Sequence, residues 1–261
     1  MIETKNVCKK FDSFVAIDNL NCHIPNGCIY GMVGSNGAGK STFLRLITGV
    51  YKPETGSVLV DGEEVFDNPK VKEKIMFVSD DLFFLKGTNI KKMTRFYKSL
   101  FNRFDGEYFN ILLKEFRLPA DKPIEKFSQG MKRQTAIILA LACKPDYYVF
   151  DETFDGLDPV VRDLVKKHIC KEVLDRKATA IITSHSLREL ENLCDQLALL
   201  HEGGLVLEND VDNLKTSLYK IQIAFDRETS KEDFCDLDIM SYSKLGSITT
   251  IIGRGRIDEV K

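Results

Sequence analysis

A glycine-rich stretch decides the fold of this chain: Gly34-Ser35-Asn36-Gly37-Ala38-Gly39-Lys40-Ser41-Thr42. It matches the spacing GxxxxGK[ST] and lies between a strand predicted at Cys28–Val33 and a helix predicted at Ser41–Thr48. Glycines let backbone N–H groups wrap a phosphate, and the helix end adds a positive dipole. Lys40 then reaches the β- and γ-phosphates, and the Ser41 hydroxyl ligates Mg²⁺. A flexible glycine turn is the alternative, but the flanking strand and helix favour a nucleotide site.

Composition places the chain among ordinary globular proteins. It has 261 residues, of which 43% are hydrophobic and 29% are charged. This length predicts one α/β domain with an appendage rather than two equal domains. Because the formal net charge is −2, no overall basic field attracts nucleic acid, and we expect no nucleic-acid partner.

Three features predict a cytosolic protein. The longest apolar run, Thr135–Cys143, is far shorter than the roughly eighteen residues that span a bilayer. The first ten residues, MIETKNVCKK, have no apolar core, so we expect no signal peptide. The seven cysteines form no CxxC pair, which is typical of thiols in a reducing compartment rather than of a disulfide or zinc framework.

Strand-like and helical stretches follow one another along the chain. Four early strands are predicted at Ile2–Val7, Leu20–Ile24, Val58–Val60 and Glu64–Phe66. Residues 88–117 are predicted to be helical, with Thr88 and Asp105 as candidate N-caps, and a further helix is predicted at Met131–Cys143. Helices then alternate with strands at Tyr147–Phe150, Ala178–Thr183 and Leu197–Leu200. This alternation predicts a parallel sheet covered on both faces.

Two carboxylates end the predicted strand at Tyr147–Phe150. On a parallel strand, Asp151 emerges at the carboxyl edge, where α/β proteins bind ligands, and can hold Mg²⁺ through water. Glu152 can orient or deprotonate an attacking water. A solvated acidic turn is the alternative, but the phosphate loop in the same chain favours the functional interpretation.

A histidine follows the next strand at the same sheet edge. His185 is therefore placed where a γ-phosphate contact is needed, although a lone histidine is more often structural. The other histidines have no such context, and no role is assigned to His23, His168 and His201.

A second helix begins with small and polar residues suited to an anion: Ser128, Gln129 and Gly130. One nucleotide has no evident use for two such sites in one chain. A dimer in which this second site meets the γ-phosphate held by the partner resolves the difficulty. A plain serine N-cap is the alternative.

Taken together, these residues resemble the nucleotide-binding subunit of ABC ATPases. GSNGAGKST (34–42) resembles Walker A, and YYVFDE (147–152) resembles Walker B with Glu152 as the catalytic acid. FSQGM (127–131) resembles the LSGGQ signature, TSH (183–185) the switch histidine, and FDGLD (154–158) the D-loop. Phe11 stands where the family stacks an aromatic ring on adenine. The resemblance covers roughly residues 1–215. It implies ATP and Mg²⁺ as ligands, a head-to-tail sandwich of two chains, identical or not, and a membrane permease partner.

The chain departs from the family pattern at two positions. Asp80 replaces the glutamine that touches Mg²⁺ and the attacking water, and because a carboxylate can still ligate Mg²⁺, Asp80 is a candidate metal ligand. Gln129 replaces a signature glycine that contacts the γ-phosphate. FVSDD (77–81) with DETFDGLDP (151–159) is similar to bacterial export-type subunits, including the Ytr-like and antibiotic-export groups. The family places its permease contact near Lys86–Arg103, for which a solvated helix face is the alternative.

The sequence thus predicts an α/β P-loop NTPase of the ABC type. Residues 1–214 form the ATP-binding domain, with an N-terminal antiparallel β subdomain and a helical subdomain at about 81–143, and residues 215–261 form a small α+β appendage. The predicted function is ATP hydrolysis that powers a separate permease at the inner face of the membrane, in an exporter. Two alternatives stay open at this point: a soluble ABC ATPase for iron–sulfur-type assembly, and a nucleotide-sensing module with little turnover.

Overall fold

A six-stranded sheet carries the site, with its strands in the order β10-β9-β3-β8-β7-β6. The strands are β3 (Ile29–Val33), β6 (Ile75–Val78), β7 (Tyr147–Phe150), β8 (Thr179–Ser184), β9 (Gln196–His201) and β10 (Gly204–Asp210). The pairs β9/β3, β3/β8, β8/β7 and β7/β6 are parallel. Every residue of β7 and β8 is buried, as the parallel sheet predicted from their apolar runs requires.

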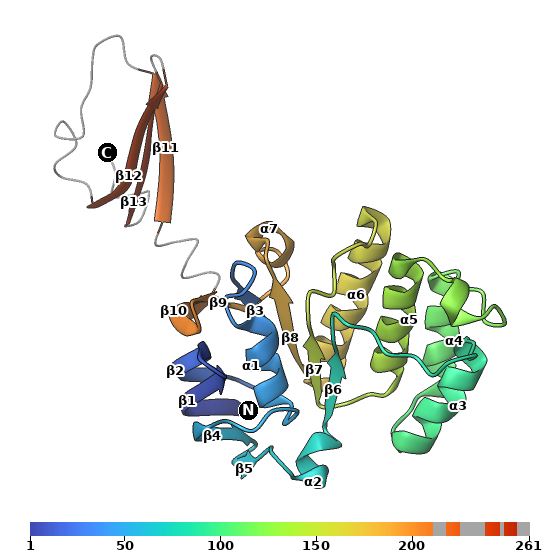
Figure 1. Cartoon of the computed structure of the whole chain (residues 1–261). Coiled ribbons are helices and arrows are strands. Elements are labelled where there is room, and N and C mark those ends of the chain that lie inside the picture. The colour runs from blue at the N-terminus through green and yellow to red at the C-terminus, as the bar shows by residue number, and fades with distance from the viewer. Residues whose placement is uncertain (211–217, 225–237, 246–247, 255–261) are drawn as a thin grey trace. The chain divides into compact units, whose positions relative to one another are not determined.

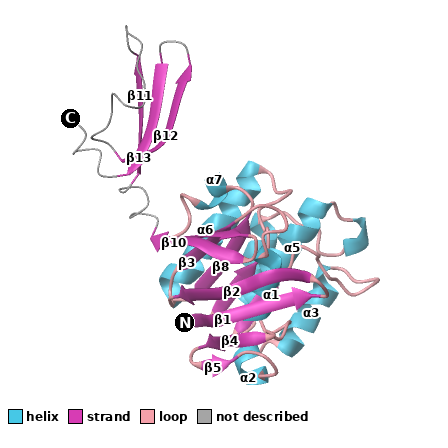
Figure 2. Ribbon diagram, turned by 60° about the vertical axis from the view of Figure 1, so that its left-hand side comes forward, coloured by secondary structure: helices cyan, strands magenta, loops and turns pink. Residues whose placement is uncertain are grey.

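A second, antiparallel sheet has the order β2-β1-β4-β5. Its strands are β1 (Ile2–Phe11), β2 (Phe14–Ile24), β4 (Thr55–Val60) and β5 (Glu63–Glu64). Helix α1 (Lys40–Ile47) packs between the two sheets, and its buried side chains Phe43, Leu44, Leu46 and Ile47 join one core with residues of both (Figure 1, Figure 2). The predicted N-terminal β subdomain is confirmed. The packing fixes α1 and the loop before it.

The helices between β6 and β7 gather on the side of the six-stranded sheet away from β1, β2 and β4 (Figure 1). They are α3 (Ile90–Leu100), α4 (Gly106–Glu115), the short 3₁₀ helix η1 (Ile124–Lys126) and α5 (Gln129–Ala142). All four fall within the residues predicted for the helical subdomain. The remaining helices are α2 (Pro69–Lys72), α6 (Pro159–Arg176) and α7 (Leu187–Leu190).

The ends of several elements differ from the prediction. Asp105 caps α4 as expected, by accepting a hydrogen bond from the Tyr108 N–H. The prediction of Thr88 as the cap of α3 is wrong: Asn89 caps this helix, while the Thr88 hydroxyl donates to the carbonyl of Leu85. Both residue types can cap a helix, so composition alone does not choose between neighbours.

The computed structural model describes residues 1–210, 218–224, 238–245 and 248–254. The chain forms two compact units, Met1–Glu208 and Asn209–Lys261. In the second unit, β11 (Leu218–Ala224), β12 (Asp238–Leu245) and β13 (Ile248–Arg254) form an antiparallel sheet in the order β11-β13-β12. The predicted boundary at 214/215 and the helical part of the predicted appendage lie outside the described residues. Within the described ranges, no helix combines the length and the apolar character that a membrane crossing requires.

Candidate nucleotide site

The phosphate loop joins β3 to α1 and wraps around its own lysine. The Lys40 ammonium donates to the carbonyls of Gly34 (2.8 Å) and Ser35 (3.1 Å), and only 4% of the residue is exposed. Gly39 opens α1 with a φ of +106°, a conformation that side chains with a Cβ rarely adopt. A Cβ built on Gly39 would lie 2.6 Å from the carbonyl oxygen of Ala16, so β2 also requires glycine here.

A cavity of about 250 Å³ opens over this loop. Its walls come from the loop, the start of β2 and the end of β7: Phe14, Ala16, Asn36, Gly37, Gly39, Lys40, Ser41, Thr42 and Glu152. The N-terminus of α1 points its amide groups toward this cavity without a capping side chain, since the N-cap is a glycine. Backbone donors, a helix dipole and an ammonium group therefore converge on one anion-sized space.

Asp151 follows β7 and is almost completely buried, with 1% of the residue exposed. Its Oδ1 accepts a hydrogen bond from the Thr183 hydroxyl (2.8 Å), whereas its Oδ2 has no hydrogen-bond partner within the described part of the chain. Burial raises the pKa of Asp151, and the hydroxyls of Ser41 and Thr183 oppose this shift. A buried, unsatisfied carboxylate oxygen beside the Ser41 hydroxyl is an oxygen-donor set of the kind that Mg²⁺ prefers, so the residues fit this ion.

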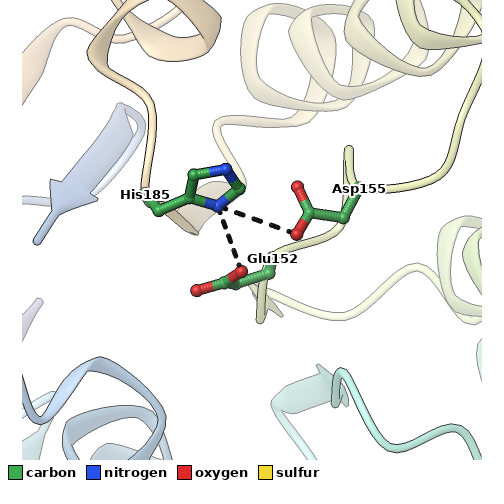
Figure 3. Close-up of side chains that lie close together, drawn as sticks. All are labelled: Glu152, Asp155 and His185. Carbon is green, nitrogen blue, oxygen red and sulfur yellow. Dashed lines mark hydrogen bonds and ion pairs between the residues drawn. The ribbon is translucent and has the colours of Figure 1, made fainter. Parts of the chain in front are cut away.

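Glu152 lies at the centre of the charged groups. Its Oε1 is 3.2 Å from the Lys40 ammonium, and its Oε2 is 3.4 Å from Nδ1 of His185. The same imidazole nitrogen is 3.7 Å from Oδ2 of Asp155, so two carboxylates face one histidine (Figure 3). This set of Glu152, Asp155 and His185 is the one group of three potential metal ligands found within the described residues.

The two carboxylates titrate differently because they share this space. Burial alone would raise the pKa of Glu152, but hydrogen bonds from Asp155 and Lys40, with the charge of Lys40, lower it overall. Burial raises the pKa of Asp155, and the neighbouring Glu152 raises it further. Glu152 is thus kept ionised, as a base or a water-orienting group requires.

The backbone of Glu152 is held in an unusual conformation. Its φ is +45°, a left-handed value that costs a residue with a Cβ about 1–2 kcal/mol. Its N–H donates to the Thr183 hydroxyl (3.0 Å), and its carbonyl accepts from the Arg133 guanidinium (2.5 Å). Strain of this type is concentrated at functional sites, where the surrounding structure maintains it.

The second predicted anion site stands apart from the loop cavity. Ser128 caps α5 by accepting a hydrogen bond from the Met131 N–H (3.2 Å), and Gln129 and Gly130 form the first turn. None of these three residues lines the loop cavity. A Cβ on Gly130 would lie 3.0 Å from the carbonyl of Gly156, so this end of α5 adjoins the loop that follows Glu152.

Two predicted site residues have other neighbours in the structure. Phe11 packs edge-on against Tyr51 with ring centroids 5.4 Å apart, and its cross-strand partner Phe14 lines the cavity instead. Asp80 forms an ion pair with Arg133 (2.5 Å) and lines a separate groove. The structure therefore brings together Lys40, Ser41, Asp151, Glu152 and His185, and does not place Phe11 or Asp80 in the loop cavity.

Three residues of this site did not emerge from the sequence: Phe14, Arg133 and Thr183. Phe14 lines the cavity at the start of β2, where the β1/β2 ladder has a register shift and residues 14–17 do not alternate in burial, so strand periodicity does not predict its position. Thr183 is the first residue of the TSH stretch and faces the Asp151 carboxylate across a parallel strand pair. Arg133 contacts groups 19 and 53 positions away, and no local pattern signals such pairs.

A strand, a glycine loop and a helix that converge on a buried lysine, with acidic residues at the neighbouring strand end, define a P-loop nucleotide-binding protein of the α/β class. Residues 17–155 match the ABC transporter family. The chain belongs to this family.

Two curated proteins and one solved structure are similar to this chain. The ABC transporter ATP-binding protein YtrB of Bacillus subtilis is 33% identical over 88% of this chain and 79% of its own length. The bacitracin transport ATP-binding protein BcrA of Bacillus licheniformis is 31% identical over 82% of this chain and 71% of its own. A solved dimeric ATP-binding cassette in a post-hydrolysis state with ADP and Pi superposes with a TM-score of 0.73 at 23% identity, covering 81% of this chain and 99% of that one. The protein is an ATP-binding subunit of the ABC transporter family and an ATPase.

Proposed function

We propose that this chain powers a separate membrane permease, in an exporter, and that it lies on the inner face of the membrane through that partner. The observation that carries the proposal is a groove of about 660 Å³ beside the ATPase site. Apolar side chains line it together with charges of both signs: Asp80, Asp81, Leu82, Phe84, Leu85, Lys86, Ile124, Glu125, Gln129, Lys132 and Arg133. A groove of mixed character suits a protein segment rather than a membrane or a nucleic acid. It overlaps the start of the Lys86–Arg103 stretch where the family resemblance implies a permease contact.

Within the ATPase site, each residue has a proposed role. Lys40 and the loop amides bind the β- and γ-phosphates of ATP, and Glu152 orients or deprotonates the attacking water. His185, held by Glu152, contacts the γ-phosphate. Ser41 and Asp151 would hold Mg²⁺, which supplies charge neutralisation on the phosphate oxygens. Asp80 as a further Mg²⁺ ligand, Phe11 as an adenine contact and the domain boundary near 214 stay predictions.

The position of the N-terminus of α5 favours the proposal that the protein acts as a dimer. Ser128, Gln129 and Gly130 do not line this chain's own loop cavity. We infer that they contact the γ-phosphate bound by a second ABC ATPase chain, identical or not, in a head-to-tail arrangement. The dimeric cassette described above has a similar fold.

Two observations favour transport over the alternatives of an assembly ATPase or a sensing module. The relatives described above are named for transport. In addition, the complete set of Lys40, Glu152 and His185 is assembled around one loop, as turnover requires. Export is proposed because of the FVSDD and DETFDGLDP stretches and the bacitracin transport relative.

Loss of permease binding from a groove variant tests the proposal. Leu85→Asp puts a charge on a groove wall, whereas Ile111→Asp puts the same charge on an equally apolar, exposed residue of α4 outside the groove. Tagged chains are expressed in their native cells and purified from detergent-solubilised membranes. We expect a polytopic membrane protein to accompany the wild type and Ile111→Asp but not Leu85→Asp. Recovery of the wild type without any membrane protein would contradict the proposal.

A further inference from the structure

One arginine connects the helical subdomain to the carbonyl of the residue proposed to activate water. Arg133 lies on α5, five residues beyond Ser128, and only 13% of its side chain is exposed. One guanidinium nitrogen donates to the backbone carbonyl of Glu152, and the other donates to Oδ1 of Asp80, each at 2.5 Å. Both hydrogen bonds are charge-assisted because the guanidinium donor is charged, and the one to Asp80 also has a charged acceptor. Hydrogen bonds of this class are shorter and stronger than those between neutral groups.

The contact to Glu152 falls on a peptide group that needs support. Glu152 has the left-handed φ of +45°, which a residue with a Cβ avoids unless its surroundings impose it. The Thr183 hydroxyl holds the N–H of this residue and Arg133 holds its carbonyl. The direction of the Glu152 side chain, and hence its approach to Lys40 and His185, depends on this backbone conformation.

We propose that Arg133 is a positioning residue for ATP hydrolysis, which fixes the carbonyl of Glu152 and is itself oriented by Asp80. The inference rests on the proposed role of Glu152. Arg133 contacts no part of the phosphate loop in the described structure, so it acts on catalysis through Glu152 and not on ATP binding.

This assignment gives Asp80 a use that its sequence position alone did not suggest. The carboxylate at position 80 forms an ion pair across 53 positions with the arginine that touches Glu152. A neutral side chain at position 80 would hold the guanidinium less firmly, because an Arg–carboxylate contact combines charge with fixed direction. Asp80 and Arg133 also line the proposed permease groove. A permease segment bound in this groove therefore contacts Arg133, the same side chain that holds the carbonyl of Glu152.

Separate measurements of turnover and ATP affinity test the inference. The purified full chain is assayed for phosphate release at saturating MgATP and for ATP affinity by titration. Arg133→Gln keeps a side chain able to donate but removes the charge and the second contact. We expect kcat to fall about ten- to hundredfold, since small misplacements of a reacting group have effects of this order. The dissociation constant for ATP should change less than about threefold, because Lys40 and the loop are untouched.

Two further variants separate positioning from general damage. Arg133→Lys retains the charge but not the fork, so it should recover part of the lost kcat. Lys74→Gln removes a comparable ion pair, Lys74–Asp61 at 2.9 Å, which lies outside the site and the groove, and should leave kcat unchanged. If Arg133→Gln does not fold, the partial loss in Arg133→Lys carries the test.

Asp80→Asn tests whether Asp80 acts through Arg133. We expect a smaller fall in kcat than in Arg133→Gln, and no additional fall when the two changes are combined, since coupled residues are not additive. Wild-type kcat in Arg133→Gln, or equal losses of kcat and ATP affinity, would overturn the inference. Glu152→Gln distinguishes this failure from that of the proposed function: if Glu152→Gln is inactive while Arg133→Gln is normal, only the role of Arg133 is wrong.

Discussion

Replacing one loop glycine should damage the protein much more than replacing its neighbour two residues earlier. Gly37 and Gly39 both have positive φ values, +81° and +106°. A Cβ on Gly37 meets nothing within 4 Å, whereas a Cβ on Gly39 would lie 2.6 Å from the Ala16 carbonyl oxygen and 3.0 Å from Cδ1 of Ile17. The same chemical change therefore adds backbone strain at one position, and strain plus overlap with β2 at the other.

The magnitudes follow from these two terms. A residue with a Cβ in this part of backbone space costs about 1–3 kcal/mol, and overpacking against fixed neighbours costs about 1–3 kcal/mol more. We expect Gly37→Ala to lose about 1–3 kcal/mol of stability and Gly39→Ala about 2–6 kcal/mol. Relief of the overlap has to move the start of β2 or the loop, which also form the cavity walls. Gly39→Ala should therefore weaken ATP binding as well.

Urea unfolding with and without ATP measures both effects. The midpoint should fall further for Gly39→Ala than for Gly37→Ala at an unchanged slope. Added ATP should raise the midpoint of wild type and Gly37→Ala by mass action, and raise that of Gly39→Ala less. Equal losses of stability in the two variants would show that the close approach between Gly39 and Ala16 does not exist in solution.

Three further predictions concern single side chains. Lys40→Ala should abolish ATP binding in a direct titration, because the phosphates lose their main positive partner; near-native affinity would refute the phosphate-loop assignment. Glu172 is buried and accepts hydrogen bonds from Lys144 (2.5 Å), Tyr148 (3.0 Å) and Arg176 (2.8 Å). Glu172→Ala should therefore cost about 3 kcal/mol in urea unfolding; a loss under about 1 kcal/mol would contradict this. Burial lowers the pKa of His168 although Glu115 opposes the shift, so the unfolded chain binds the proton more readily. Stability should then decline as the pH falls below about 6.5 toward the folded pKa. His168→Gln should flatten this decline between pH 7.5 and 5.5, and an unchanged slope would exclude His168 as its source.

Local chemistry made much of the site predictable from the sequence. The loop 34–42 and the carboxylates after β7 lie within short stretches whose spacing is fixed by a strand end and a helix start. Asp105 is predictable as a cap, as is the plain serine cap at Ser128 that the sequence offers as the alternative to an anion site, because the hydrogen bond that defines a cap spans only three residues. Such features need no knowledge of the rest of the chain.

The remaining features depend on contacts between distant residues. The partnership of Arg133 with Asp80 forms only when α5 packs beside the end of β6, and nothing near either residue signals it. Phe11 and Phe14 face each other across one hairpin, and which ring lines the cavity is decided by the pleat and by packing against Tyr51. His168 packs between Tyr108 and Glu115 of α4, so its context comes entirely from the tertiary fold.

The central claim is that ATP is bound and hydrolysed between two chains. Trapping of an ATP-bound dimer by Glu152→Gln tests this claim most directly. This change removes the charge that orients or activates water, and losing such a group costs about a hundred- to ten-thousandfold in rate. ATP binding should survive because Lys40, Ser41 and the loop amides are unchanged.

Size-exclusion chromatography of this variant, alone or with its partner chain where the dimer is heteromeric, should show a shift from monomer to dimer only when ATP is added. Adding Ser128→Arg should abolish the shift, since its bulk blocks the end of α5 while leaving the loop cavity intact. We expect both results. Wild-type turnover in Glu152→Gln, or an ATP-dependent dimer that persists with Ser128→Arg, would contradict it.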